Sequence, residues 1–252
     1  MIDVRKYASV FGLFAKSSLT KILLTITAMA AAQIWIFVSL VAKELTAYNM
    51  KLSVANIETL IDRAPMGWIF GIAFVLISVL LCIPGTSFSS KTGYTLDRLS
   101  ISSRSVFFCQ AIYNLCVLFI LWVAETAVCF GLCLYYTEVM PAEIIANQSV
   151  FLAFYRNKLL HSLLPLSDVW VWIRNAFLLI ALSIATAEYP YKQRHKKAGI
   201  SAIAMVIFTL VFFKTDIVNS FNTALIIVVS VINVIEMCYN FFSEDNSYVG
   251  EN

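Results

Sequence analysis

Charged side chains are scarce in this sequence. They make up 13% of its residues, and 60% of the residues are hydrophobic. An ordinary soluble domain has roughly 25% charged residues, so this composition excludes one and favours an integral membrane protein. The formal net charge of +3 is small and carries no electrostatic signature of nucleic-acid binding.

Histidine and the common catalytic motifs are lacking as well. The only histidines are His161 and His195, and neither falls within an apolar run. There is no GxSxG elbow and no HExxH motif, which disfavours a serine hydrolase or a zinc enzyme. Residues 85–92, GTSFSSKT, approach a P-loop, but Ser90 replaces the second glycine that lets the backbone wrap phosphates. We therefore expect no catalytic residue, metal site or nucleotide site in this chain.

Apolar runs, in contrast, recur along the chain. A helix needs roughly 20 apolar residues to cross the hydrocarbon, and about 17 at the short limit. The runs predict six transmembrane helices, at residues 22–42, 66–83, 106–136, 169–187, 198–213 and 223–242. The third is long enough to project from the bilayer, and the fifth is short. Because no small-residue cleavage pattern follows the first run, we expect no signal peptide.

Lysine and arginine are unevenly distributed between the connecting segments. Residues 1–21, 84–105 and 188–197 carry eleven of them, whereas the three alternate loops carry six, mixed with acidic residues. Cytoplasmic loops hold the excess of positive residues, so both termini are predicted to face the cytoplasm. The predicted fold is an all-α polytopic membrane protein with one transmembrane domain over residues 1–252.

The segment before the first span has the pattern of an amphipathic helix. Arg5 and Lys16 lie opposite an apolar face at 100° per residue, which consists of Val4, Tyr7, Ala8, Phe11, Phe14 and Ala15. This predicts an interfacial helix over residues 1–21. It is either a simple anchor or a lever that passes force into the first span.

A similar pattern lies in the predicted extracellular loop, residues 137–168. Four apolar residues repeat at four-residue spacing, at Phe151, Tyr155, Leu159 and Leu163. Polar residues lie opposite, at Arg156, Asn157, Lys158 and His161. We predict a second amphipathic helix here, on the outer surface.

Two charged residues within the apolar runs are placed at one depth by helix geometry. Glu125 lies about 31 Å along a helix from Arg104, and Arg174 comes five residues after the start of the fourth run. Both positions fall near the outer leaflet. Because an unpaired charge in hydrocarbon costs several kcal/mol, we expect Glu125 and Arg174 to form an ion pair that joins the third and fourth spans.

Glu236 is different, because it has no opposite charge at its level. It lies roughly 20 Å into the sixth span, and we expect it to line a translocation path together with Gln33 and Asn233. The alternative is that Asn233, Glu236 and Asn240 lie at a helix–helix interface.

The loop between the second and third spans mixes apolar and charged residues. Residues 95–101, TLDRLSI, place Leu96, Leu99 and Ile101 beside an acid and an arginine, and Ser102 is suited to cap the long helix that follows. A loop surrounded by water would not need these apolar residues. We expect it to rest on the membrane surface or in a groove of another protein.

The run YTLDRLSISSRSVFF, together with the six-span plan and the N-terminal helix, resembles the permease subunits of type 2 ABC exporters. The run is similar to that family's stretch of threonine, hydrophobic residue, acid, arginine, leucine, any residue, isoleucine and serine. In the family this stretch forms a coupling helix that inserts into a cleft of a separate cytoplasmic ATPase. The resemblance implies an ATPase contact made by Thr95, Leu96, Asp97, Arg98, Leu99, Ile101 and Arg104.

The resemblance also implies a function and partners. The chain would be the membrane-spanning subunit of an ATP-driven exporter in the cell membrane, expected to be a bacterial plasma membrane. A second permease subunit would complete the path, and partner ATPases would bind ATP and Mg²⁺, with no cofactor in this chain. Many members place their outer helices between the fifth and sixth spans, whereas here the outer helix falls between the third and fourth. The subfamily and the substrate therefore stay open, with a peptide or antimicrobial favoured.

A rival function keeps the chain in the membrane without an ATPase. A secondary transporter or a substrate-binding membrane subunit would use ionisable groups at the membrane midplane. Apart from Gln33 and Glu236, the predicted midplane has few such groups, which favours the exporter subunit. A non-transporting membrane scaffold or an intramembrane enzyme is a third alternative, which the absent motifs disfavour.

Overall fold

The structure is a computed structural model of the chain, and it describes residues 4–84, 86, 102–141, 143–145, 148–166, 168–194, 199–213 and 220–249. For residues 4–6, 103–104, 194, 212–213, 220–222, 237–238 and 240–249 it describes the backbone alone. The predicted coupling residues Thr95, Leu96, Asp97, Arg98, Leu99 and Ile101 lie outside the described residues, and the side chain of Arg104 is not described.

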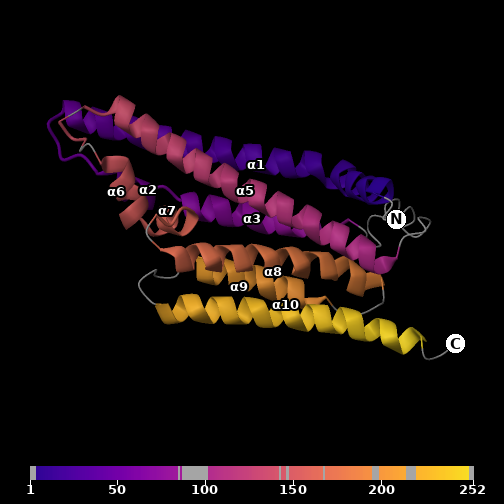
Figure 1. Cartoon of the computed structure of the whole chain (residues 1–252). Helices are drawn as coiled ribbons and strands as arrows, with labels where there is room; N and C mark the ends of the chain where they lie inside the picture. The colour runs from indigo at the N-terminus through magenta and orange to yellow at the C-terminus, as the bar shows by residue number, and fades with distance from the viewer. Residues whose placement is uncertain are drawn as a thin grey trace. The chain divides into compact units, whose positions relative to one another are not determined.

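The described residues are helical or lie in connections, with no strand among them (Figure 1). This confirms the all-α prediction. The helices are α1 (Val4–Asn49), α2 (Ile57–Arg63), α3 (Met66–Cys82), α5 (Ser103–Val139), α6 (Ser149–Arg156), α7 (Lys158–Leu163), α8 (Val169–Arg194), α9 (Ile200–Phe213) and α10 (Ser220–Val249).

Three of these helices, α1, α5 and α8, are long and apolar enough to cross a membrane. Helices α2 and α3 make a fourth candidate if they count as one span bent by 49°. Shorter apolar helices occupy Ile200–Val211 and Thr223–Glu236. The chain therefore has the helices of a membrane-embedded protein, and each predicted span falls on a helix. Six crossings and the orientation of the termini stay predictions.

Helices α1 and α5 exceed the length of a span. They contain 46 and 37 residues, or about 69 and 55 Å at 1.5 Å per residue, against a hydrocarbon thickness of about 30 Å. The segment predicted as a separate interfacial helix is the start of α1 and continues into the first span without a break. In the described part of this N-terminal segment the buried residues are Val10, Phe14 and Ser18, while Tyr7 and Phe11 are each 37% exposed.

The bend between α2 and α3 has a local cause. Ala64, the residue that follows α2, precedes Pro65 and has an extended backbone (φ −73°, ψ 129°). The proline ring disfavours the helical region for the residue before it, and it cannot donate the next helical hydrogen bond. Helix α3 then begins at Met66.

The described contacts group the chain into two compact units. The first unit contains Met1–Ile22, Ile77–Phe119 and Ile173–Asn252, and the second contains Leu23–Leu76 and Ile120–Trp172. Helices α1, α3, α5 and α8 each contribute residues to both units. A single transmembrane domain therefore stays a prediction.

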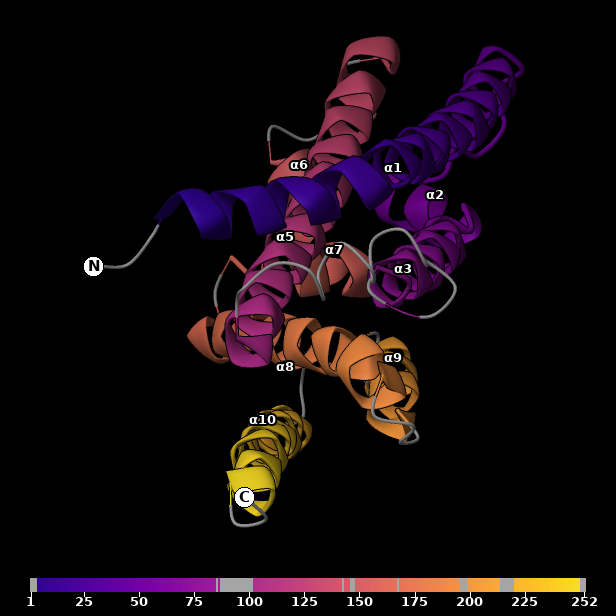
Figure 2. The ribbon, with the colours of Figure 1, turned by 90° about the vertical axis from the view of Figure 1, so that its right-hand side faces the viewer.

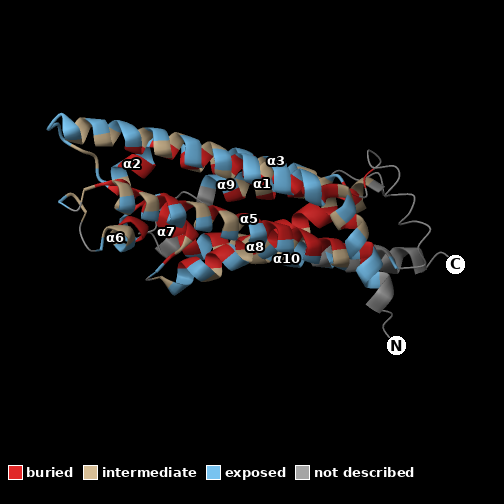
Figure 3. Cartoon of the chain, turned by 90° about the horizontal axis from the view of Figure 1, so that it is seen from above, coloured by how far each residue is buried: buried red, intermediate tan, exposed pale blue. Residues whose placement is uncertain are grey.

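Each unit buries stripes of its helices (Figure 3). In the first, Phe107 and Ala111 of α5 pack with Ala187 of α8, and Ile184 and Tyr191 cover them. In the second, α2 and α6 lie side by side (Figure 1). Many of the large apolar side chains that stay exposed, such as Trp35 of α1 and Ile232 of α10, lie on the long helices, where lipid would cover them.

Candidate functional site

A buried polar cluster joins three helices of the second unit. Gln33 of α1 donates from Nε2 to Glu125 Oε1 of α5 at 2.8 Å and to the carbonyl oxygen of Met66, at the start of α3, at 3.4 Å. Cys129, one turn after Glu125, has its Sγ 3.7 Å from the same Oε1 and donates to it. Gln33 and Glu125 are both 0% exposed. The cluster is thus a polar contact within apolar stretches of these helices.

The orientation of the Gln33 amide follows from its neighbours. A backbone carbonyl oxygen only accepts, so the amide group that faces Met66 must be the donor NH₂. The opposite atom, Gln33 Oε1, and the second carboxyl oxygen, Glu125 Oε2, are buried and have no hydrogen-bond partner in the described part of the chain. Two acceptors are therefore left in the middle of a packed site.

The contacts within each unit do not test the predicted ion pair between Glu125 and Arg174. Arg174 is 1% exposed and donates from Nε and Nη2 to Asn175 Oδ1, at 3.2 and 3.0 Å. It belongs to the first unit, whereas Glu125 belongs to the second. The pair stays a prediction, and Gln33 is the partner of Glu125 that the structure adds.

The residues predicted to line a translocation path belong to different units. Gln33 lies in the second unit, and Asn233 and Glu236 of α10 lie in the first. Asn233 is half-buried and donates to the carbonyl oxygen of Val229 in its own helix at 2.8 Å. Glu236 is exposed, and the side chain of Asn240 is not described. A shared path through these residues stays a prediction.

The two ends of the predicted coupling loop are held in the first unit. Gln110 Nε2 of α5 donates to the carbonyl oxygen of Pro84, which follows α3, at 3.3 Å. The backbone N–H of Ser105 donates to Ser102 Oγ at 3.3 Å, so Ser102 caps α5 as predicted. The residues on either side of segment 85–101, Pro84 and Ser102, are thereby each held by a hydrogen bond to α5.

The beginning of α1 packs on the beginning of α5 (Figure 2). Tyr113 of α5 receives most of these contacts: Phe11 meets its ring edge to face with centroids 5.4 Å apart, and Phe14 stacks on it at 6.2 Å. The Ser18 hydroxyl lies 2.8 Å from the Tyr113 hydroxyl. Tyr7 reaches Ser105, one turn from the base of the loop, at 3.4 Å. The N-terminal segment is therefore in contact with α5, the helix that follows the predicted coupling loop.

A buried ion pair near the end of α8 escaped the sequence patterns. Glu188 is 2% exposed and contacts Lys192 Nζ at 2.7 Å, one turn later. Ser201 of α9 donates to its second carboxyl oxygen at 2.8 Å. An acid and a lysine four residues apart on one helix are a signal of such a pair, but the sequence analysis assigns Lys192 to a basic loop, whereas the structure places it in α8.

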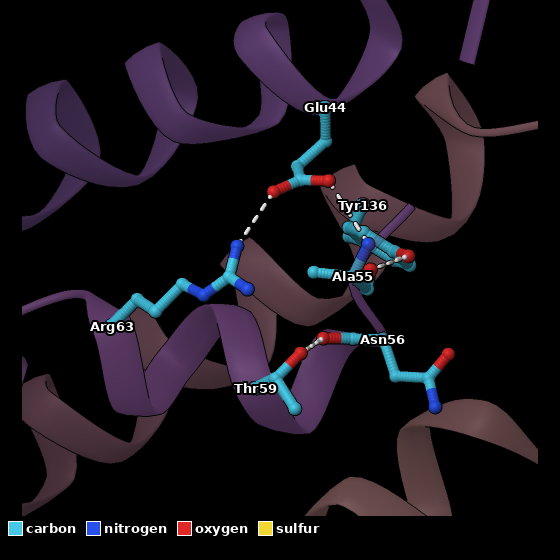
Figure 4. A network of polar contacts seen from close by, with 6 residues as sticks. All are labelled: Glu44, Ala55, Asn56, Thr59, Arg63 and Tyr136. Carbon is cyan, nitrogen blue, oxygen red and sulfur yellow. Dashed lines mark hydrogen bonds and ion pairs between the residues drawn. The ribbon is translucent and has the colours of Figure 1, made fainter. Parts of the chain in front are cut away.

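The connection between α1 and α2 is fixed by a network around Glu44 (Figure 4). Glu44 accepts from Arg63 Nη1 at 3.0 Å and from the backbone N–H of Ala55 at 2.9 Å. Tyr136 of α5 donates its hydroxyl to the Ala55 carbonyl at 3.0 Å. The network connects the α1–α2 loop to α1 and α5, two long helices of the second unit, which is a structural role.

The predicted outer amphipathic helix is two short helices in the structure. Asn157 ends α6 with an extended backbone and caps α7, its Oδ1 accepting from the N–H groups of Leu159 and Leu160. Its Nδ2 donates to Asp62 Oδ1 at 2.9 Å. Leu159 is buried as the pattern expected, but so is His161, which the pattern placed on the polar side. Neither ring nitrogen of His161 has a hydrogen-bond partner among described residues.

Neither a metal-binding group in the described part of this chain nor a known relative was found. In the described residues no three histidine, cysteine or acidic side chains gather in a group that could hold a metal ion. No family model, curated protein or solved structure matches the chain.

Proposed function

We propose that this chain is the membrane-spanning permease subunit of an ATP-driven exporter of the type 2 ABC class. In this proposal it crosses the membrane six times with both termini in the cytoplasm, and it forms the path with a second permease subunit. Separate ATPase subunits dock on residues 95–101, and a peptide or antimicrobial is the substrate. The candidate spans and the two shorter apolar helices support the plan, since each falls on a predicted span.

The observation that carries the proposal is the packing at the base of segment 85–101. Gln110 ties the end of α3 to the beginning of α5, and Tyr7 and Tyr113 tie α1 to the same turns of α5. A push on this segment by a nucleotide-driven partner would therefore reach three membrane helices. Such a push biases two arrangements of similar free energy, as alternating access requires.

The decisive experiment tests the coupling segment. Leu96→Asp with Leu99→Asp should abolish co-purification with the ATPase and transport, because a charged pair would not enter an apolar cleft. The matched control is Met50→Asp with Leu52→Asp, a pair of exposed apolar residues in the α1–α2 loop, which should keep both. If no ATPase co-purifies with the unchanged protein, or if the Leu96 and Leu99 variant retains association and transport, the proposal is wrong.

One observation favours the rival, an ATPase-independent secondary transporter. The Gln33–Glu125 contact places a carboxyl group, 0% exposed, within long apolar helices, and secondary transporters use such groups for coupling ions. Proteoliposomes decide between the two functions. Uptake driven by an ion gradient alone supports the secondary transporter, whereas transport that needs the ATPase and ATP supports the exporter subunit.

A further inference from the structure

The contacts of the Gln33–Glu125 cluster leave a specific deficit. Both hydrogens of the Gln33 amide are used, by Glu125 Oε1 and the Met66 carbonyl oxygen, and Oε1 also accepts from Cys129. What remains is Gln33 Oε1 and Glu125 Oε2, both buried and both without a donor among described residues. An unpaired buried polar atom costs about 1–3 kcal/mol. A site with two such acceptors and no donor between them is missing a hydrogen.

The cluster also lacks a positive charge. Among the described residues of the second unit, the lysine and arginine ion pairs are Arg63 with Glu44 and Arg156 with Glu58, and none involves Glu125. The titratable side chain in contact with it is Cys129, with Cys133 one turn further along α5. Helices α1 and α3 present an amide and a backbone carbonyl, which do not titrate. Within the described part of the second unit, an ionised Glu125 would thus be a charge without a counter-ion.

A single proton removes both deficits, whereas a divalent metal ion does not. Mg²⁺ takes six ligands and Ca²⁺ six to eight oxygens, and the cluster offers two free ones. A proton on Glu125 Oε2 neutralises the carboxyl group and turns that oxygen into a donor. Gln33 Oε1, on the amide already bonded to this carboxyl group, is an acceptor that lacks a donor.

We propose that Glu125 and Gln33 form a proton-binding site within the membrane-embedded helices. Glu125 binds the proton on Oε2 and shares it with Gln33 Oε1, so that the carboxyl and amide groups make two opposed hydrogen bonds. When the proton leaves to water, the carboxylate keeps the N–H of Gln33 and the S–H of Cys129 on Oε1. Both states have hydrogen bonds, as a reversible site requires. The inference is independent of whether an ATPase or an ion gradient powers the protein.

Infrared difference spectroscopy of the full-length protein in lipid nanodiscs, between acid and alkaline buffer, tests the site. We expect a carboxylic C=O band that shifts in deuterated water and is lost in Glu125→Gln. That variant should keep its elution volume and helicity, because an amide closes the same pair of hydrogen bonds with Gln33. The control is Glu188→Gln, which removes a buried carboxylate paired with Lys192 and should leave the band in place.

A second variant keeps the test open if Glu125→Gln fails to fold. Gln33→Leu removes the amide, so the band should persist but move to higher frequency as its carbonyl loses a hydrogen bond. A band unchanged in both variants overturns the proposal. So does a band absent from the unchanged protein, or a response of Glu125 to sodium at constant pH in place of a response to pH.

Discussion

Helix α5 carries buried polar side chains in both units, and their partners differ. In the first unit Asn114 donates to Thr186 of α8 at 2.9 Å, and Tyr113 and Ser18 share a hydrogen bond. In the second unit Glu125 is paired through one oxygen and Gln33 through its nitrogen, and the other oxygen of each is left over. The first set is what helix packing alone requires. The second set has two acceptor oxygens without a hydrogen-bond donor, and a ligand or proton would bind there.

The largest expected effect is the loss of stability when an acid with both oxygens paired is replaced. Glu188→Ala in the first unit should lower the free energy of unfolding by about 2 kcal/mol, because it strands Lys192 and leaves Ser201 without its acceptor. The loss stays below the upper range for buried pairs, since the Lys192 side chain is 20% exposed. Unfolding in mixed micelles measures it. Glu188→Gln, which keeps an acceptor for Ser201, should lose about half as much, and an equal loss in both variants would contradict this account.

The next effect compares two asparagines at the beginnings of helices in the second unit. Asn157→Ala should cost about 2 kcal/mol, because its side chain caps α7 and donates to Asp62. Asn56 precedes α2, but its side chain makes no capping hydrogen bond. Asn56→Ala should therefore change stability by less than about 0.5 kcal/mol. Equal losses in the two variants would show that position, and not the hydrogen bonds, determines the effect.

The positions of the apolar helices could be predicted from sequence because run length is a local property. The helical cap at Ser102 was predictable for the same reason, and the cap at Asn157 had a signal too, since asparagine competes with the helix backbone for hydrogen bonds. That signal conflicts with the four-residue apolar repeat on both sides of Asn157, which predicts one continuous helix.

The pairing of Gln33 with Glu125 could not be predicted in this way. The two residues are 92 positions apart, and depth along a helix says nothing about which faces of α1 and α5 meet. Depth alone assigned Gln33 to a path and Glu125 to Arg174. Packing of α1 on α5 decides the actual contact, and that is a property of the whole helix surface.

Like the Gln33–Glu125 cluster, His161 has buried polar atoms without hydrogen-bond partners among the described residues. His161→Phe should raise stability by about 1 kcal/mol, because it removes two buried nitrogens that lack hydrogen bonds and keeps a ring against Tyr155. Thermal unfolding in detergent reports the change. A loss of similar size would mean that the imidazole binds an ion, a water molecule or a partner, and would place His161 with Glu125 as a site.

The smallest effect lies in the paired set, at the contact between Ser18 and Tyr113. A double-mutant cycle with Ser18→Ala and Tyr113→Phe should give a coupling energy of about 0.6 kcal/mol, the average for hydrogen bonds between membrane helices. The phenylalanine keeps the ring contacts with Phe11 and Phe14, so the cycle isolates the hydroxyl pair at 2.8 Å. In the exporter proposal the same contact connects the N-terminal helix to the helix that leaves the coupling segment. If the double variant keeps transport while the coupling energy is present, the hydrogen bond stabilises the fold and α1 passes its force through the aromatic rings.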